Sequence, residues 1–302
     1  MSVPFTLIVP EQLTDATFVS SNVPETDYPT WTTGTSYSVG QRVIVTTGHH
    51  KIYQCITTHS GVNHFPPDSP TIWAEVGPTN RWAMVDQSGG TVTSNPDSIV
   101  FTFTASKVTA IGFLELNAAS VQVVGTAGGS EFYNQTFTLT DEANIQDWYE
   151  YFTLDIDTAT EAIFLSIPYI SGSQFTVTIS NPGGTAACGN MIFGDAFLIG
   201  QTQYGATAGI IDYSKKSVDE FGRVQLVKRN SSKRINANVW VTKDMTDKVF
   251  RKLNDARATA CLWISAKDQY ECLTVYGFYR DYSIGIEYPS YSILQIEIEG
   301  LT

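Results

Sequence analysis

The sequence has few of the residues from which most catalytic and metal sites are built. All four histidines lie between positions 49 and 64 and no GxSxG motif occurs, so a Ser-His-Asp triad is not expected. The four cysteines form no CxxC pair, which argues against a zinc site and against a disulfide framework; they are Cys55, Cys188, Cys261 and Cys272. The sequence therefore predicts no catalytic residues, no bound metal and no enzyme.

Phosphate-binding and sugar-cleaving motifs are also missing. The run Gly125-Thr-Ala-Gly-Gly129 is not followed by lysine, and it predicts a turn rather than a phosphate loop. Asp155 and Asp157 could share one strand face, and we interpret them as an acidic rim, because glycosidase carboxylates must face each other across a cleft. No cofactor is expected.

Positive charge is scarce in the first two thirds of the chain. Residues 1–211 contain 4 Lys and Arg against 18 Asp and Glu, whereas residues 212–302 contain 14 against 12. Nucleic-acid surfaces need clustered cations, so sequence-specific nucleic-acid binding is not expected. No apolar run reaches the ~20 residues that cross a bilayer, and the N-terminus lacks the pattern of a signal peptide. We therefore expect a soluble, unprocessed chain without membrane insertion.

Aromatic and β-branched residues are what the sequence has in quantity. Aromatic residues make up 12% of the chain and charged residues only 16%, a balance that favours pleated, half-buried surfaces over helices. At 302 residues the chain is also long for one domain. We predict a mainly β, multidomain protein with an N-terminal arm over 1–26, a small β module over 27–80, a β-sandwich over 81–202 and an α+β domain over 203–302.

Short strands at close intervals dominate residues 85–200. Apolar segments separated by Gly, Asn and Ser turns fall at 100–104, 108–116, 120–124, 137–139, 149–154, 162–167 and 174–179. This spacing is typical of an antiparallel β-sandwich. Together with the closing segment 192–200, it is similar to the galactose-binding type of jelly roll, a likeness that implies a fold and no function.

The last hundred residues have a different charge balance and contain the one long helix that we expect. Thr242 is a suitable N-cap, and Met245, Val249 and Leu253 fall near one face, so the helix is predicted to end at Asp255 or Arg257. Strands are predicted on both sides of it. A sheet with one packed helix makes residues 203–302 an α+β domain.

Four cations gather within residues 227–234, in the segment Val-Lys-Arg-Asn-Ser-Ser-Lys-Arg. Lys228, Arg229, Lys233 and Arg234 are candidates for subunit contacts, because residues 1–211 supply an acidic surface in every copy of the chain. Contact with phosphates and a plain solvated hairpin tip are the alternatives.

The small module has a recognisable order of aromatic, glycine and proline residues. That order is Trp31, Tyr37-Ser-Val-Gly40, Val43, Tyr53, Gly61, prolines 66, 67 and 70, and Trp73-Ala-Glu-Val76. It resembles the small chitin-binding modules attached to chitinases. A unit of this size has little core, so we expect Tyr37, Tyr53 and Trp73 to supply most of it.

The resemblance also implies a place for sugar contact. Chitin-binding modules present a pair of exposed aromatic residues just beyond the position of Cys55, and Thr57 and Thr58 stand there in this chain. His59, His64, Phe65 and Trp31 are therefore the candidates for carbohydrate contact.

A second resemblance covers residues 1–86. The string Ser21-Asn-Val-Pro-Glu-Thr-Asp-Tyr-Pro-Thr-Trp31 and the later Gly77-Pro-Thr-Asn-Arg-Trp-Ala-Met84 are similar to tail proteins of tailed double-stranded DNA bacteriophages, and the C-terminal content resembles tube-related domains of tail and baseplate proteins. The resemblance implies a structural tail-tip or distal tail (baseplate) protein, made in the host cytoplasm and located in the virion. Its expected partners are further copies of itself in a ring, other tail proteins and host-surface polysaccharide. The alternative is a carbohydrate-binding adhesin, a receptor-binding tail protein.

Overall fold

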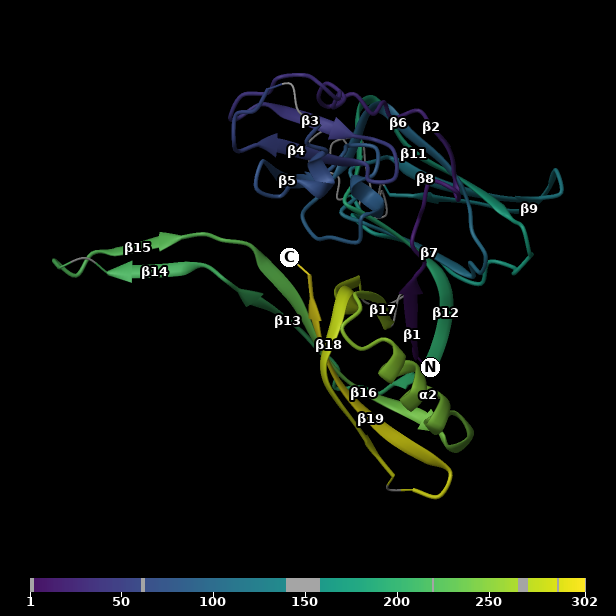
Figure 1. Ribbon diagram of the computed structural model, residues 1–302. Helices are drawn as coiled ribbons and strands as arrows, with labels where there is room; N and C mark the ends of the chain where they lie inside the picture. The colour runs from purple at the N-terminus through teal and green to yellow at the C-terminus, as the bar shows by residue number, and fades with distance from the viewer. Residues whose placement is uncertain are drawn as a thin grey trace, which may run out of the picture. The chain divides into compact units, whose positions relative to one another are not determined.

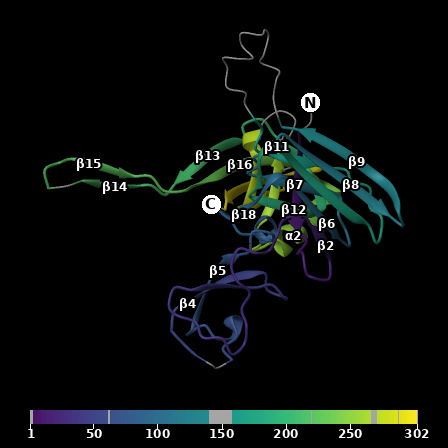
Figure 2. The same ribbon diagram turned by 90° about the horizontal axis from the view of Figure 1, so that it is seen from above.

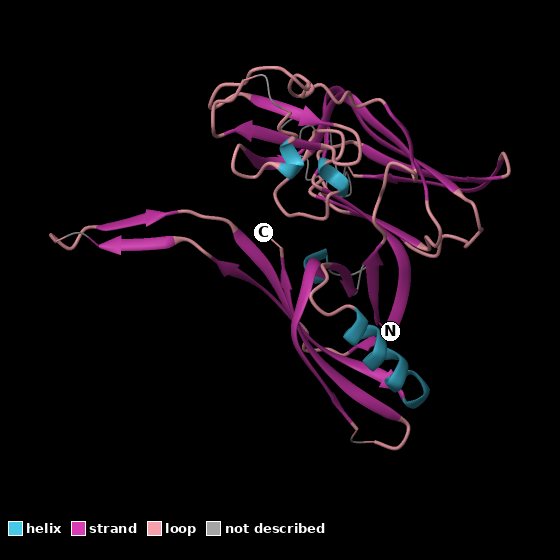
Figure 3. Ribbon diagram, in the orientation of Figure 1, coloured by secondary structure: helices cyan, strands magenta, loops and turns pink. Residues whose placement is uncertain are grey.

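The computed structural model describes residues 3–60, 63–139, 158–218, 220–265, 271–286 and 288–301. Strands dominate these residues, and they contain one α-helix, which confirms the prediction of a mainly β chain (Figure 3). The chain divides into two compact units, one made of residues 1–10 and 192–302 and the other of residues 11–191. The strand expected at 149–154 and the pair Asp155 and Asp157 lie outside the described residues.

The first unit is a closed ring of antiparallel strands. Its order is β12-β1-β17-β18-β19-β16, and β16 pairs in turn with β12. The bounds are β1 Val3–Pro10, β12 Asn190–Thr202, β16 Ser231–Thr242, β17 Cys261–Ser265, β18 Thr274–Gly285 and β19 Tyr291–Gly300. Because each strand has two neighbours, this barrel leaves little unpaired edge.

A glycine permits the pairing of β12 with β16 that closes the barrel. Gln201 and Thr202 of β12 pair with Trp240 and Val239 of β16. A Cβ atom at the preceding residue, Gly200, would collide with the backbone carbonyl oxygen of Trp240. Only glycine allows the two backbones to approach this closely.

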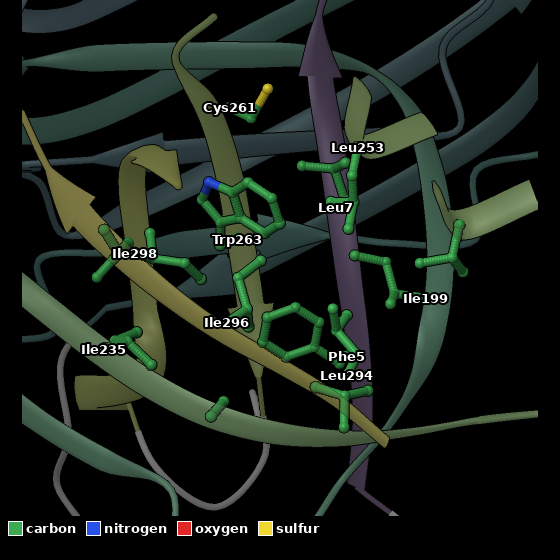
Figure 4. Close-up of a cluster of buried hydrophobic side chains, with 14 of the residues drawn as sticks. Phe5, Leu7, Ile199, Ile235, Leu253, Cys261, Trp263, Leu294, Ile296 and Ile298 are labelled. Atoms are coloured by element: carbon green, nitrogen blue, oxygen red, sulfur yellow. The ribbon is translucent and has the colours of Figure 1, made fainter. Parts of the chain in front are cut away.

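The interior of the barrel is filled by alternating apolar side chains. In β19, and in β16 from Ile235 onward, every second residue is buried, as expected for strands with one face in a core. Figure 4 shows the centre of the cluster, in which the ring of Trp263 lies near Phe5, and the indole Nε1 of Trp263 donates a hydrogen bond to the carbonyl of Gly277 (3.0 Å). The helix α2, Lys243–Asp255, covers this cluster with Val249 and Leu253.

The first strand is not part of a separate N-terminal segment, as we predicted for residues 1–26. β1 pairs with β12 on one side and β17 on the other, and Phe5 and Leu7 are fully buried in the barrel core. Residues 192–202, which we assigned to the sandwich, belong to the same unit. The apolar pattern of a strand shows that it is buried but does not show which distant strand it pairs with.

A long hairpin extends from the barrel. Strand β13, Thr207–Asp212, pairs with the start of β16, and β14, Lys215–Val218, pairs with β15, Val224–Val227. In Figures 1 and 2, β14 and β15 run outward beyond β13 and β16 and meet no other strand of this unit. We call residues 213–229 the arm.

The second unit contains a five-stranded antiparallel sheet in the order β2-β6-β11-β8-β9, and a β7–β10 pair. The strands are β2 Phe18–Ser21, β6 Thr93–Thr104, β7 Ala110–Leu114, β8 Ser120–Ala127, β9 Ser130–Thr138, β10 Ala162–Phe164 and β11 Gln174–Cys188. Alternate residues of β8 are buried, including Val121 and Val123, so one face of the sheet lies on a core.

Between β2 and β6 the chain forms a three-stranded sheet, β3-β4-β5, which we call the module sheet. Its strands are β3 Arg42–Val45, β4 Lys51–Cys55 and β5 Trp73–Pro78, with short 3-10 turns at Pro66–Asp68 and Ala83–Val85. The buried cluster contains Tyr53 and Trp73, and Tyr37 packs against it. The expected core residues therefore lie together.

Candidate functional site

The arm carries an apolar stripe on one of its faces. Val218 is paired with Val224, and Lys216 with Leu226, so these four side chains project from the same side of the ribbon. Val218, Val224 and Leu226 are 58%, 56% and 73% exposed. A two-stranded ribbon has no core of its own, so its apolar side chains stay in water unless another surface covers them.

The four predicted contact cations do not act as one group. Arg234 lies on β16, where its Nε is 3.1 Å from a carboxylate oxygen of Glu297 in the same chain. Lys228 and Arg229 lie in the exposed turn between β15 and β16, and Lys233 is exposed on β16. Three of the four predicted cations are thus exposed near the base of the arm, whereas Arg234 is paired with Glu297.

A groove of about 540 Å³ lies at the same place. It is lined by Tyr213 and Arg229 from the arm and by Glu299 and Leu301 from the end of the chain. The hydroxyl of Tyr213 donates a hydrogen bond to Glu299 (3.0 Å), which fixes the root of the arm to the barrel. The groove and the exposed cations therefore lie at the root of the arm.

The predicted carbohydrate contacts are mostly engaged in packing within the module. Trp31 and Phe65 meet edge to face, with ring centroids 5.2 Å apart, and both pack on the module core. The backbone of His59 exchanges two hydrogen bonds with Tyr37, and its ring lies 5.5 Å from that of Trp73. The main-chain oxygen of His64 accepts a hydrogen bond from Trp73 Nε1 (3.0 Å). These contacts bring the four candidates together around Trp73.

The ring of His59 sits in a poorly hydrated place. Neither ring nitrogen has a hydrogen-bond partner among the described residues. Burial lowers the pKa of His59 below its usual value, and the nearby His64 lowers it further. A neutral ring held in this way supports packing rather than charge-assisted recognition.

The two threonines that replace the aromatic pair are exposed but use their hydroxyls locally. Thr57 donates to the carbonyl of Thr71 (3.1 Å), and the hydroxyl of Thr58 accepts a hydrogen bond from the amide of Val39 (3.3 Å). Among the described residues of the module, no aromatic side chain belongs to the exposed large hydrophobic residues. Trp31, Tyr37 and Phe65 are instead half-buried against the module core.

A charged cluster that the sequence did not reveal surrounds His50. Its Nε2 is 2.6 Å from Oδ1 of Asp15, and its Nδ1 is 2.9 Å from Oε1 of Glu25. The imidazole stacks on Trp82, with ring centroids 3.9 Å apart. Glu25 also accepts hydrogen bonds from the hydroxyl of Thr79 (2.8 Å) and from Arg81 (3.3 Å). Nothing local predicts these contacts, because Asp15 and Glu25 are 35 and 25 residues away in the sequence.

The pKa values in this cluster follow from its geometry. Burial alone would lower the pKa of His50, but the hydrogen bonds to Glu25 and Asp15 outweigh it and raise the pKa above its usual 6.5. The hydrogen bond to His50 lowers the pKa of Asp15 below its usual 3.8. Both shifts favour the charged pair.

Neither a metal site nor a membrane-spanning helix is found among the described residues. Among the described residues no group of three or more His, Cys, Asp or Glu side chains could hold a metal ion. No helix in the described part of the chain is long and apolar enough to span a membrane. Comparison of the chain with protein-family models, with curated proteins and with solved structures gave no match.

Proposed function

We propose that this chain is a structural component of a bacteriophage tail tip or baseplate, and that the barrel and its arm assemble copies of it into a ring. The arm is the observation that carries the proposal. Its stripe of Val218, Val224 and Leu226 is exposed in one copy of the chain, and burial of such a stripe stabilises association by roughly 25 cal/mol per Å² of apolar surface.

The distribution of charge favours a second copy of the chain as the partner that binds the arm. The arm contains five Lys and Arg against two Asp and Glu, whereas the whole chain has a net charge of −12. A cationic arm and an acidic body attract each other between copies, and closed rings reuse one such contact at every subunit. The resemblance of residues 21–31 and 77–84 to phage tail proteins supports the tail as the assembly in question.

Removing the apolar stripe tests this proposal. We expect the wild-type chain to form an oligomer in native mass spectrometry and light scattering, and Leu226→Asp combined with Val224→Asp to shift it to monomer. Val39→Asp is the matched control, because Val39 is 63% exposed but lies in the module. A wild-type chain that stays monomeric at high concentration, or an arm variant that assembles like wild type, would contradict the ring.

The location needs a separate measurement. Antibodies against this chain should label one end of the tail in electron micrographs of virions from the phage that encodes it. Labelling of the capsid, or of no part of the particle, would contradict the tail assignment while leaving the oligomer intact.

A further inference from the structure

His50 joins the module sheet to segments that lie outside it. It follows the turn between β3 and β4, where its φ of +52° places the residue in the left-handed region. Asp15 comes from the segment before β2, Glu25 from the segment between β2 and the module sheet, and Trp82 from the turn after β5. One side chain therefore meets three segments outside the module sheet, which come before β2, after β2 and after β5.

The two distances favour a charged ring. A neutral imidazole has one N–H group, so only one of its nitrogens can donate a hydrogen bond. Both nitrogens of His50 lie within hydrogen-bond distance of a carboxylate oxygen, at 2.6 Å and 2.9 Å. A neutral ring would direct the lone pair of one nitrogen at a carboxylate, whereas the protonated ring donates to both.

The surrounding charges balance only when the ring is protonated. Glu25, whose side chain is 7% exposed, faces both His50 and Arg81, and Asp15 faces His50 and the amide of Gly48. His50 and Arg81 thus offset Asp15 and Glu25. Loss of the proton from His50 leaves one uncompensated carboxylate at a partly buried junction, which is unfavourable.

Other ionisable groups line the adjoining cavity of about 760 Å³. Lys51 and Glu75 pair with each other (2.6 Å). Asp86 accepts hydrogen bonds from the amide of Ser88 and the hydroxyl of Thr91, and burial raises its pKa. His49, whose ring lies against Phe65, also lines the cavity. His50 is therefore the group whose protonation decides whether the negative charges of Asp15 and Glu25 are both offset.

We propose that protonated His50 is a clamp that holds the module sheet against the segments around β2, and that loss of its proton loosens the module. The inference does not depend on the proposed function. The clamp is fully present below the usual histidine pKa of 6.5 and is lost as the pH rises through the higher value of the folded protein. At the acid end it weakens as the pH falls through the lowered pKa of Asp15.

An apolar contact also joins β2 to the turn after β5, and it limits how far the module sheet can separate from β2. The ring of Phe18 in β2 lies 5.4 Å from that of Trp82 and 5.3 Å from that of Phe101. These contacts do not titrate. Deprotonation should therefore increase the opening of the module without releasing it from the rest of its unit.

Nuclear magnetic resonance of the wild-type chain gives the first test. The Cε1 protons of all four histidines are followed from pH 4 to 10, with His50→Gln used only to assign its resonance. We expect His50 to titrate above 6.5 and above His59, whose pKa is lowered. A His50 that titrates at or below 6.5 would overturn the clamp, and this result does not require any variant to fold.

Hydrogen exchange measured by mass spectrometry gives the second test. At each pH the exchange of β3–β5 amides in His50→Gln is divided by that in wild type, so that the intrinsic pH dependence of exchange cancels. We expect a ratio above one at pH 6, where His50 of the wild type is charged, and a ratio near one above the raised pKa of the folded protein. His49→Gln is the control from the same turn and should give a ratio near one throughout. Equal ratios for the two variants, or a ratio that does not depend on pH, would reject the proposal.

Discussion

The barrel and the module sheet hold their strands together in different ways. The barrel closes on itself around a large apolar cluster to which β1, five later strands and α2 contribute. The module sheet has three strands and buries Val43, Val45, Tyr53, Cys55 and Trp73. It supplements that small core with the charged contacts of His50. A small core leaves the fold more dependent on polar contacts, and the protonation of those contacts makes its stability depend on pH.

Truncation of a barrel core residue should have the largest effect. Trp263 is 1% exposed, and Trp263→Ala removes a side chain that contacts Phe5 and Tyr279. We expect a loss of about 3–5 kcal/mol in the free energy of unfolding, since large-to-small changes in a close-packed core leave a cavity. Chemical denaturation followed by circular dichroism measures it. A loss below about 1 kcal/mol would mean that the barrel interior is not close-packed.

Removal of the buried charge in the junction should have a smaller effect, limited to the module. Glu25→Gln keeps the size of the side chain but removes the negative charge that faces His50 and Arg81. Hydrogen bonds to charged groups stabilise by about 1.5–3 kcal/mol, and we expect a loss of this order in the stability of the module sheet. Hydrogen exchange of β3–β5 amides measures the loss, and the barrel amides are the internal control. An equal loss of protection in the barrel and in the module sheet would show that Glu25 does not stabilise the module sheet alone.

The sequence predicted the elements better than their partners. The helix beginning after Thr242 and the alternating strand before it follow from local spacing, and the structure contains α2 and β16 there. The pairing of β1 with β17 and the contact of His50 with Asp15 join residues far apart in the chain, and no local pattern encodes them. The cations also illustrate this limit. Position alone could not show that Arg234 is paired with Glu297 whereas Lys228 is exposed.

The arm shows a further limit, because its apolar residues look like those of a buried strand. Val224 and Leu226 alternate with polar residues, and such alternation normally indicates one face on a core. In the structure the whole of β15 is exposed. Hydrophobic alternation indicates that one face of a strand is apolar. It does not indicate whether that face packs on the same chain or on another one.

The smallest effect on stability is expected for Leu226→Asp in the arm. Leu226 is 73% exposed, so the substitution removes little buried surface within one copy. Surface changes of this kind usually alter the free energy of unfolding by less than about 0.5 kcal/mol. Thermal and chemical unfolding of the monomer at low concentration should therefore match wild type, even where assembly is lost. If the variant monomer were destabilised by about 2 kcal/mol, the arm would pack on its own chain, and the argument that its apolar stripe is meant for another copy would fail.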